Sequence, residues 1–237
     1  MKKPLIGIVV RKEITKDQNY LISNEAIRVA LIEEGALPIL LLPMGEVDYR
    51  KFDPLEIPYK VGMKEDLYQI LDLCDGFILP GGTCWYELDE EIISYALRED
   101  KPLLAICLGM QALGKMLQPD IIPIVDPTIA NKTVINHDQP NVDYVHKVMI
   151  KKDTLLYSII GKDIIFVNSR HNYHIENVQD KFISAFSEDK LIEGIEVPNK
   201  KFILGIQWHP ENLLYKDETS KRLIKSFIKS CEKNSIK

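Results

Sequence analysis

Two short motifs contain residues that could carry out nucleophilic chemistry. Cys107 stands between the apolar run 103–106, which predicts a buried strand, and the stretch 108–117, which has helical periodicity. The free amides and the dipole of a helix N-terminus favour a thiolate there, and Gly109 permits the tight turn. The alternative is ordinary core packing, because free cysteine is among the most buried residue types.

The second motif, "QWHPE", lies about a hundred residues further along the chain. His209 follows an apolar run, and Pro210 restricts the turn so that Glu211 can fold back onto the imidazole. A histidine can act as base toward a thiol and as acid toward a leaving amine, while a carboxylate fixes its tautomer. With Cys107, the pair supplies the three roles of a catalytic triad. Alone, the histidine could be a core residue and "HPE" a simple turn.

A glycine pair follows another apolar run, in "FILPGG". Because they lack side chains, Gly81 and Gly82 let their backbone amides approach a ligand closely. Together with the amide of Leu108, they could form an oxyanion hole. A glycine pair by itself indicates only a turn, and this one gains meaning from its position one strand–helix unit before Cys107.

The elements that must position these residues alternate along the first half of the chain. Apolar runs typical of buried strands take turns with helical periodicity, which predicts a parallel sheet with helices on both faces. In chain order we expect strand 5–10, helix 23–35, strand 36–43, helix 64–74, strand 76–80, helix 87–100, strand 103–106 and helix 108–117.

After residue 119 the pattern changes to short apolar runs separated by turns. These runs predict antiparallel strands that extend the sheet, at 145–150, 163–169, 182–187, 191–197 and 202–208. An amphipathic helix is expected at 218–233. The predicted fold class is therefore α/β, a doubly wound and mostly parallel sheet with an antiparallel extension. We expect residues 1–237 to form a single catalytic domain.

Composition narrows the functional classes. The net charge of −5, from 35 acidic and 30 basic residues, does not provide the basic surface of a nucleic-acid-binding protein. No apolar run reaches the roughly 18–20 residues of a membrane-spanning helix. The four cysteines show neither paired metal-ligand spacing nor disulfide density. We therefore expect reduced thiols and a cytoplasmic location.

Four motifs in this order, "PGG", "AICLGMQ", "NSRH" and "IQWHPE", resemble the class I glutamine amidotransferase superfamily. Their spacing and the stretch "VNSRHNYHIENV" are most similar to its gamma-glutamyl hydrolase branch, the gamma-glutamyl-gamma-aminobutyrate hydrolase-like peptidases. The resemblance covers nearly the whole chain and implies a flavodoxin-like doubly wound sheet.

The resemblance also implies roles for individual residues. Cys107 is the implied nucleophile, His209 the base and Glu211 the orienting carboxylate. The oxyanion amides are implied at Gly82 and Leu108, whereas Gln111 and His171 are implied to contact the gamma-glutamyl group.

The chain departs from that branch at three places. Ala105 stands where the motif usually has glycine, and Leu108 stands where close relatives often carry arginine. The segment after the glycine pair is short and contains Cys84, Trp85 and Tyr86. In the branch this segment helps to shape the acceptor side of the pocket, so the resemblance does not identify the leaving amine.

His171, His174 and Glu176 are close enough in sequence to suggest a metal site. Since helix signals are absent there and the resemblance already accounts for His171, we expect no metal and no other cofactor. The expected substrate is a small gamma-glutamyl compound, without nucleic-acid or membrane partners, and a homodimer is left open.

The function expected is a cysteine-dependent hydrolase that cleaves a gamma-glutamyl amide through a glutamyl thioester, releasing glutamate and an amine. Two alternatives remain. One is a glutaminase subunit that supplies ammonia to a synthetase partner, and the other is a non-catalytic binding protein on the same fold.

Overall fold

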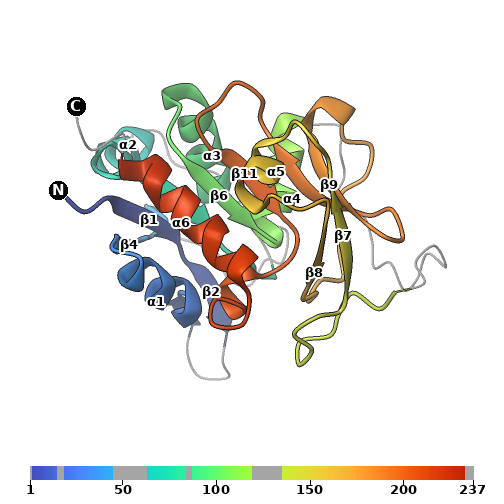
Figure 1. The fold of residues 1–237 in the computed structure, drawn as a ribbon. Helices are drawn as coiled ribbons and strands as arrows, with labels where there is room; N and C mark the ends of the chain where they lie inside the picture. The colour runs from blue at the N-terminus through green and yellow to red at the C-terminus, as the bar shows by residue number, and fades with distance from the viewer. Residues whose placement is uncertain (1, 15–18, 45–62, 84–86, 119–134, 233–237) are drawn as a thin grey trace.

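A nine-stranded sheet forms the centre of the protein, in the order β4-β1-β5-β6-β11-β10-β9-β7-β8 (Figure 1). The computed structural model describes residues 2–14, 19–44, 63–83, 87–118 and 135–232. The strand order follows from two kinds of sequence, because buried apolar runs pair in parallel and the later short runs pair antiparallel.

The first half of the sheet is parallel, as the sequence predicts. Its strands are β4 (Leu37–Leu41), β1 (Leu5–Val9), β5 (Gly76–Leu79), β6 (Leu103–Ile106) and β11 (Ile203–Ile206). The second half is antiparallel and consists of β10 (Ile192–Glu196), β9 (Ile183–Ser187), β7 (His146–Ile150) and β8 (Ile164–Val167).

Strand β11 differs from its prediction. We expected all five later runs to be antiparallel, but β11 pairs in parallel with β6 and antiparallel with β10. It therefore joins the two halves of the sheet. A second difference is a two-stranded antiparallel ribbon, β2 (Arg11–Ile14) with β3 (Asn19–Ile22), which the periodicity did not reveal.

Helices cover both faces of the sheet, which confirms the doubly wound α/β class. One apolar cluster joins the sheet to α1 (Glu25–Glu33), α5 (Leu155–Ile160) and α6 (Glu218–Glu232), the red helix that crosses in front of the strands in Figure 1. The other cluster joins it to α2 (Met63–Leu73), α3 (Glu87–Glu99) and α4 (Leu108–Leu117). A 3-10 turn, η2 (Asp180–Phe182), precedes β9.

Successive strand residues supply opposite faces of the core. In β6, Leu104 and Ile106 belong to the first cluster, whereas Leu103 and Ala105 belong to the second, and all four are fully buried. Burying a leucine or isoleucine side chain contributes roughly 1.5–3 kcal/mol to stability. The methyl of Ala105 thus fits in the core between β6 and the helices of the second cluster.

Local signals set the helix ends. The side chain of Asn24 accepts a hydrogen bond from the Ala26 N–H at 2.9 Å and caps α1.

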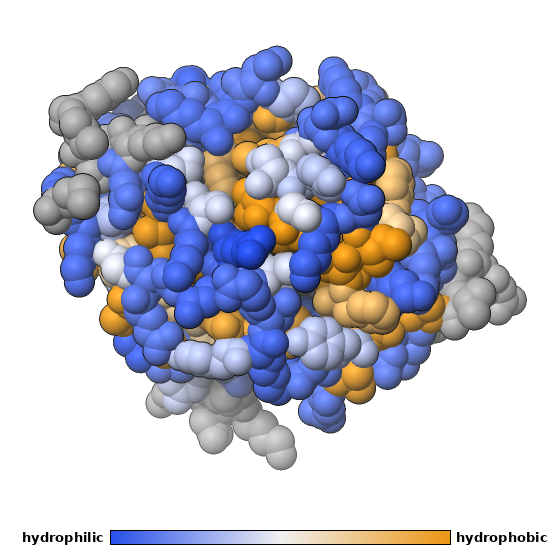
Figure 2. Space-filling model, in the orientation of Figure 1, coloured by the Kyte–Doolittle hydropathy of each residue, from blue (hydrophilic) through white to orange (hydrophobic). Residues whose placement is uncertain are grey.

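The surface of the protein in Figure 2 is mostly hydrophilic, with apolar side chains showing between charged ones. Within the described residues, no helix is both long and apolar enough to cross a membrane.

Candidate active site

The chemistry-bearing residues gather at one edge of the parallel half of the sheet. Gly81 follows β5, Cys107 follows β6 and His209 follows β11. Because these three strands are neighbours and parallel, their carboxyl ends share an edge, where α/β sheets bind ligands. Sequence position alone placed the three motifs far apart, and the strand order brings them together.

Cys107 occupies a strained turn between β6 and α4. Its backbone has φ 52° and ψ −106°, a conformation that costs a non-glycine residue about 1–3 kcal/mol. The Cys107 N–H donates to the Ile206 carbonyl at 2.8 Å, and its carbonyl accepts from the Gln111 N–H at 3.1 Å. These bonds hold the residue at the first turn of α4, where the helix dipole favours a thiolate.

Gly109 allows α4 to lie against β5. A Cβ atom at this position would lie 2.3 Å from the Leu79 carbonyl oxygen, so only glycine permits the approach. Glycine is therefore needed at position 109 because α4 packs closely against β5, in addition to its predicted role in the turn.

His209 and Glu211 form the predicted pair on either side of Pro210, which opens a 3-10 turn, η3 (Pro210–Asn212). The His209 Nδ1 donates to Glu211 Oε1 at 2.7 Å, because an ionised carboxylate can only accept. The Glu211 side chain is fully buried, and Asn24 Nδ2 also donates to Oε1, at 3.3 Å. This tautomer leaves the His209 Nε2 available to Cys107.

The charge of His209 depends on its two neighbours. Burial disfavours the imidazolium, but the Glu211 carboxylate and the hydrogen-bonded Cys107 sulfur outweigh burial and raise the pKa of His209 to about 10. At neutral pH the ring is therefore an imidazolium, which can stabilise negative charge on the neighbouring sulfur.

Asn168 fixes the backbone of His209. The His209 N–H donates to Asn168 Oδ1 at 2.8 Å, and Asn168 Nδ2 donates to the His209 carbonyl at 2.8 Å. Both bonds are buried. The residue lies just after β8, within the quoted "VNSRH" motif, but its role needed the pairing of two distant segments and was not predicted.

Arg11 supports the glycine turn and was also missed. Its guanidinium donates to the Pro80 carbonyl through Nε at 3.2 Å and Nη2 at 2.8 Å, and to the Asp89 carboxylate at 2.9 and 2.8 Å. This bidentate ion pair is buried. At Gly81, a Cβ atom would lie 2.6 Å from the His209 Cε1, so a side chain there would displace the imidazole.

Gln111 and His171 meet at one backbone carbonyl. Gln111 Nε2 donates to the Tyr173 carbonyl at 2.8 Å and lies 3.3 Å from Gln207 Oε1. His171 Nδ1 donates to the same Tyr173 carbonyl at 3.1 Å. Both side chains are buried, and their predicted contacts with a gamma-glutamyl group stay predictions.

The remaining predicted residues fall into three groups. Gly82 is exposed above Arg11, Leu108 is buried at the start of α4, and their oxyanion role stays a prediction. His174 lies 3.1 Å from Glu176. Cys84, Trp85 and Tyr86 lie outside the described residues.

Comparison with known proteins identifies the family of this chain. The model of the Peptidase C26 family matches residues 86–211. The protein NtpR of Enterococcus hirae is 36% identical, over 86% of this chain and 95% of its own. The gamma-glutamyl-gamma-aminobutyrate hydrolase PuuD of Escherichia coli K12 is 28% identical, over 98% of this chain and 95% of its own.

The fold is shared more widely. The glutaminase domain of Trypanosoma brucei CTPS, solved with bound acivicin, superposes with a TM-score of 0.65 over 98% of this chain and 94% of that chain. The sequence identity is 17%, so this likeness concerns the fold alone. The chain belongs to the Peptidase C26 family and is a hydrolase built on the fold of the class I glutamine amidotransferases.

Proposed function

We propose that this protein hydrolyses gamma-glutamyl amides through a gamma-glutamyl thioester on Cys107, releasing glutamate and an amine. The observation that carries the proposal is the convergence of a strained cysteine, at a helix N-terminus, with a buried His209–Glu211 pair. The alignment with the E. coli gamma-glutamyl-gamma-aminobutyrate hydrolase along almost the full length of both chains supports the substrate class.

In the first half-reaction, the Cys107 thiolate forms a C–S bond to the gamma-carbonyl carbon. The carbonyl oxygen becomes an oxyanion, which the amides of Gly82 and Leu108 would stabilise. The intermediate then collapses. The C–N bond breaks as His209 donates its Nε2 proton to the departing amine nitrogen.

Electrostatics favour this order of events. Before attack, the negative sulfur and Glu211 hold the proton on His209. Once the C–S bond forms, the sulfur loses its negative charge, and the pKa of His209 falls because one of its two stabilising neighbours is gone. The imidazolium thus becomes a better acid when the amine needs a proton.

The second half-reaction uses water. His209, now neutral, takes a proton from water as the oxygen attacks the thioester carbon. The C–S bond breaks, glutamate leaves, and the sulfur departs as the thiolate beside a recharged imidazolium. Gln111 would orient the glutamyl part of the substrate, and His171, bound to the same Tyr173 carbonyl as Gln111, would hold that carbonyl in place.

A panel of gamma-glutamyl amides, assayed for free glutamate, tests the proposal directly. Mass spectrometry of the quenched enzyme should show a glutamyl adduct on Cys107. The glutaminase alternative is motivated by the fold shared with a CTPS glutaminase domain. It would be indicated instead if ammonia were released from free glutamine only when a synthetase partner is added. If no amide is turned over and Cys107 does not react with iodoacetamide, the protein is a binding protein.

A further inference from the structure

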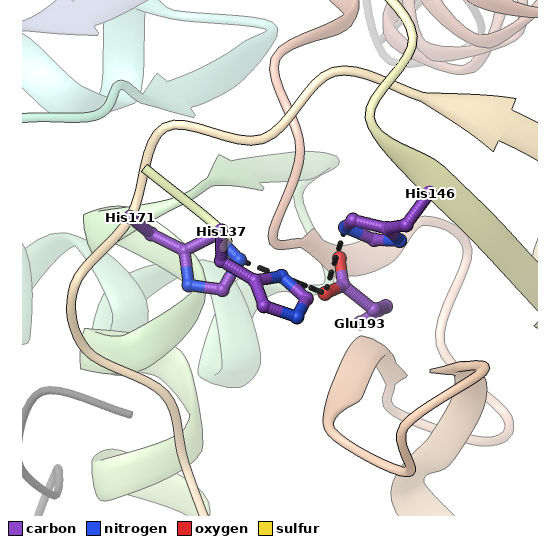
Figure 3. A group of neighbouring side chains, drawn as sticks. All are labelled: His137, His146, His171 and Glu193. Atoms are coloured by element: carbon purple, nitrogen blue, oxygen red, sulfur yellow. Dashed lines mark ion pairs between the residues drawn. The ribbon is translucent and has the colours of Figure 1, made fainter. Parts of the chain in front are cut away.

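Three histidines and a glutamate form a buried cluster, of which the proposed mechanism uses only His171. The histidine cluster consists of His137, His146, His171 and Glu193, all at most 4% exposed. One potential ligand atom from each lies within 4.8 Å of every other. Figure 3 shows the three rings converging on the carboxylate of Glu193 from separate parts of the chain.

Hydrogen bonds assign the protons on two of the rings. His146 Nδ1 lies 3.2 Å from the Lys147 carbonyl, and His171 Nδ1 lies 3.1 Å from the Tyr173 carbonyl. A carbonyl only accepts, so each Nδ1 carries the hydrogen. In the neutral ring, the Nε2 of each histidine is then a bare lone pair.

His137 is held in the opposite tautomer. Its Nε2 lies 3.1 Å from an Asp189 carboxylate oxygen, which makes Nε2 the donor, and Asp189 also accepts from the Ser187 hydroxyl at 2.5 Å. The His137 Nδ1 is therefore the lone pair, and it accepts from the Ser169 hydroxyl at 3.2 Å, a hydrogen bond that a bound ion would replace.

Three lone pairs thus surround one carboxylate oxygen. Glu193 Oε1 lies 3.6 Å from His146 Nε2, 3.6 Å from His171 Nε2 and 3.7 Å from His137 Nδ1. Among the described residues, neither Glu193 oxygen and neither of these Nε2 atoms has a hydrogen-bond partner. Buried acceptors facing one another without a donor are unfavourable, so the geometry favours a hydrogen or a cation between them.

A single hydrogen on Glu193 would not remove this repulsion, because it could pair with only one of the three lone pairs around the carboxylate. Burial lowers the pKa of all three histidines, that of His171 to about 4, in spite of the nearby carboxylates. Burial also raises the pKa of Glu193 to about 7. A metal ion supplies the missing charge without protonating any ring.

We propose that the histidine cluster binds one divalent transition-metal ion, best matched by Zn²⁺, through His137 Nδ1, His146 Nε2, His171 Nε2 and a Glu193 oxygen. In a tetrahedral zinc site, with bonds of about 2.0–2.1 Å, neighbouring ligand atoms are about 3.4 Å apart. The separations of 3.6–3.7 Å from Glu193 therefore need to shorten slightly, and any wider separation in the cluster, at most 4.8 Å, needs to shorten further.

The surroundings have the features of a metal site's outer shell. Each ring donates its other N–H to a carbonyl or a carboxylate, which fixes ring orientation and raises ligand basicity. The charges of Glu193 and Asp189 balance a divalent cation. Four buried protein ligands make a closed site, which is characteristic of structural rather than catalytic zinc.

Such an ion would stabilise the loop that positions residues of the active site. It would tie β7 and β10 to the loop after β8. That loop carries Asn168, which holds the backbone of His209, and Tyr173, whose carbonyl is bound by Gln111. The proposal departs from the expectation that the chain binds no metal, because that expectation considered His171 with His174 and Glu176 rather than with its tertiary neighbours.

Metal titration tests the proposal, and it should be done in a Cys107→Ser background because the thiolate beside His209 would compete for zinc. After removal of metal with a chelator, we expect one equivalent of Zn²⁺ per chain and a higher unfolding temperature with zinc. Co²⁺ should give the visible absorption of a tetrahedral nitrogen–oxygen site, without a thiolate charge-transfer band.

Variants decide which residues bind the ion. Glu193→Gln should weaken zinc affinity by more than about 100-fold, beyond the 10–100-fold that loss of an outer-shell partner costs. The variant should still fold without metal, since its amide can donate to an imidazole lone pair. His146→Gln should also lose zinc. His174→Gln is the matched control, a buried histidine outside the cluster, and should keep full affinity.

Two results would overturn the proposal. One is less than stoichiometric zinc binding with no shift in unfolding temperature. The other is zinc that Glu193→Gln and His146→Gln retain as tightly as the parent. If either variant fails to fold, the other and the cobalt spectrum still decide the question.

Discussion

Asn168 brackets the backbone of His209, accepting from its N–H at 2.8 Å and donating to its carbonyl at 2.8 Å. Two buried hydrogen bonds to one residue define the position from which the imidazole reaches Cys107. Asn168 is therefore a positioning residue rather than one that touches substrate.

Asn168→Ala should leave both His209 backbone groups unpaired, at about 1–3 kcal/mol for a buried group that loses its partner. Because the ring would shift, we expect kcat to fall by roughly 10–100-fold with a smaller change in KM. Asn172→Ala, which removes an exposed amide bonded to Asp138, is the control. Steady-state kinetics and thermal unfolding check both. Lost stability with unchanged kcat would leave Asn168 a purely structural role.

Cys107→Ala should abolish turnover and keep the fold. The substitution removes the nucleophile, and the small cavity should cost only about 1 kcal/mol. Activity assays, circular dichroism and the unfolding midpoint measure the two effects separately. Residual activity above a trace would show that Cys107 is not the nucleophile.

The histidine–carboxylate pair should respond unequally to substitution. His209→Ala should lose about 10²–10⁴-fold in activity, the usual contribution of general acid–base catalysis. Glu211→Gln should lose less, because an amide still holds the ring but stabilises the imidazolium poorly. If the activity of the double variant is no lower than that of the single variants, the two residues act as one unit. An unaffected Glu211→Gln would remove its orienting role.

The raised pKa of His209 predicts a pH dependence of stability. Its pKa is raised from 6.5 to about 10, so the folded protein holds a proton that the unfolded chain releases between these values. The stabilisation is fully present below about pH 6.5 and is lost as the pH rises through about 10. Chemical denaturation of wild type and His209→Gln should therefore show a stability difference that shrinks across this range. A constant difference would contradict the raised pKa of His209.

The leaving amine is predicted from sequence. We expect the short segment after Gly82 to supply Trp85 and Tyr86 as apolar area on the acceptor side. Gamma-glutamyl amides of bulky or apolar amines should then be cleaved with higher kcat/KM than gamma-glutamyl-gamma-aminobutyrate, by about 10–200-fold. Competing substrates in one reaction, with amines quantified, measure the ratio. A preference for the aminobutyrate conjugate that survives Trp85→Ala would refute this.

The sequence by itself determined the alternation of strands and helices and the two motifs that hold Cys107, His209 and Glu211. Those features are local, since periodicity, a strand–helix junction and a histidine two residues from a glutamate are readable within a few positions. The parallel first half of the sheet followed because buried strands joined by helices have few other arrangements.

Only the tertiary structure decided the position of β11, the Arg11 support of the glycine turn and the bracket that Asn168 provides. It also decided that His137, His146 and His171 converge on Glu193. Each of these contacts joins residues far apart along the chain. Which distant segments become neighbours depends on strand order and register, and the energy that selects them comes from burying the whole sheet rather than from any local pattern.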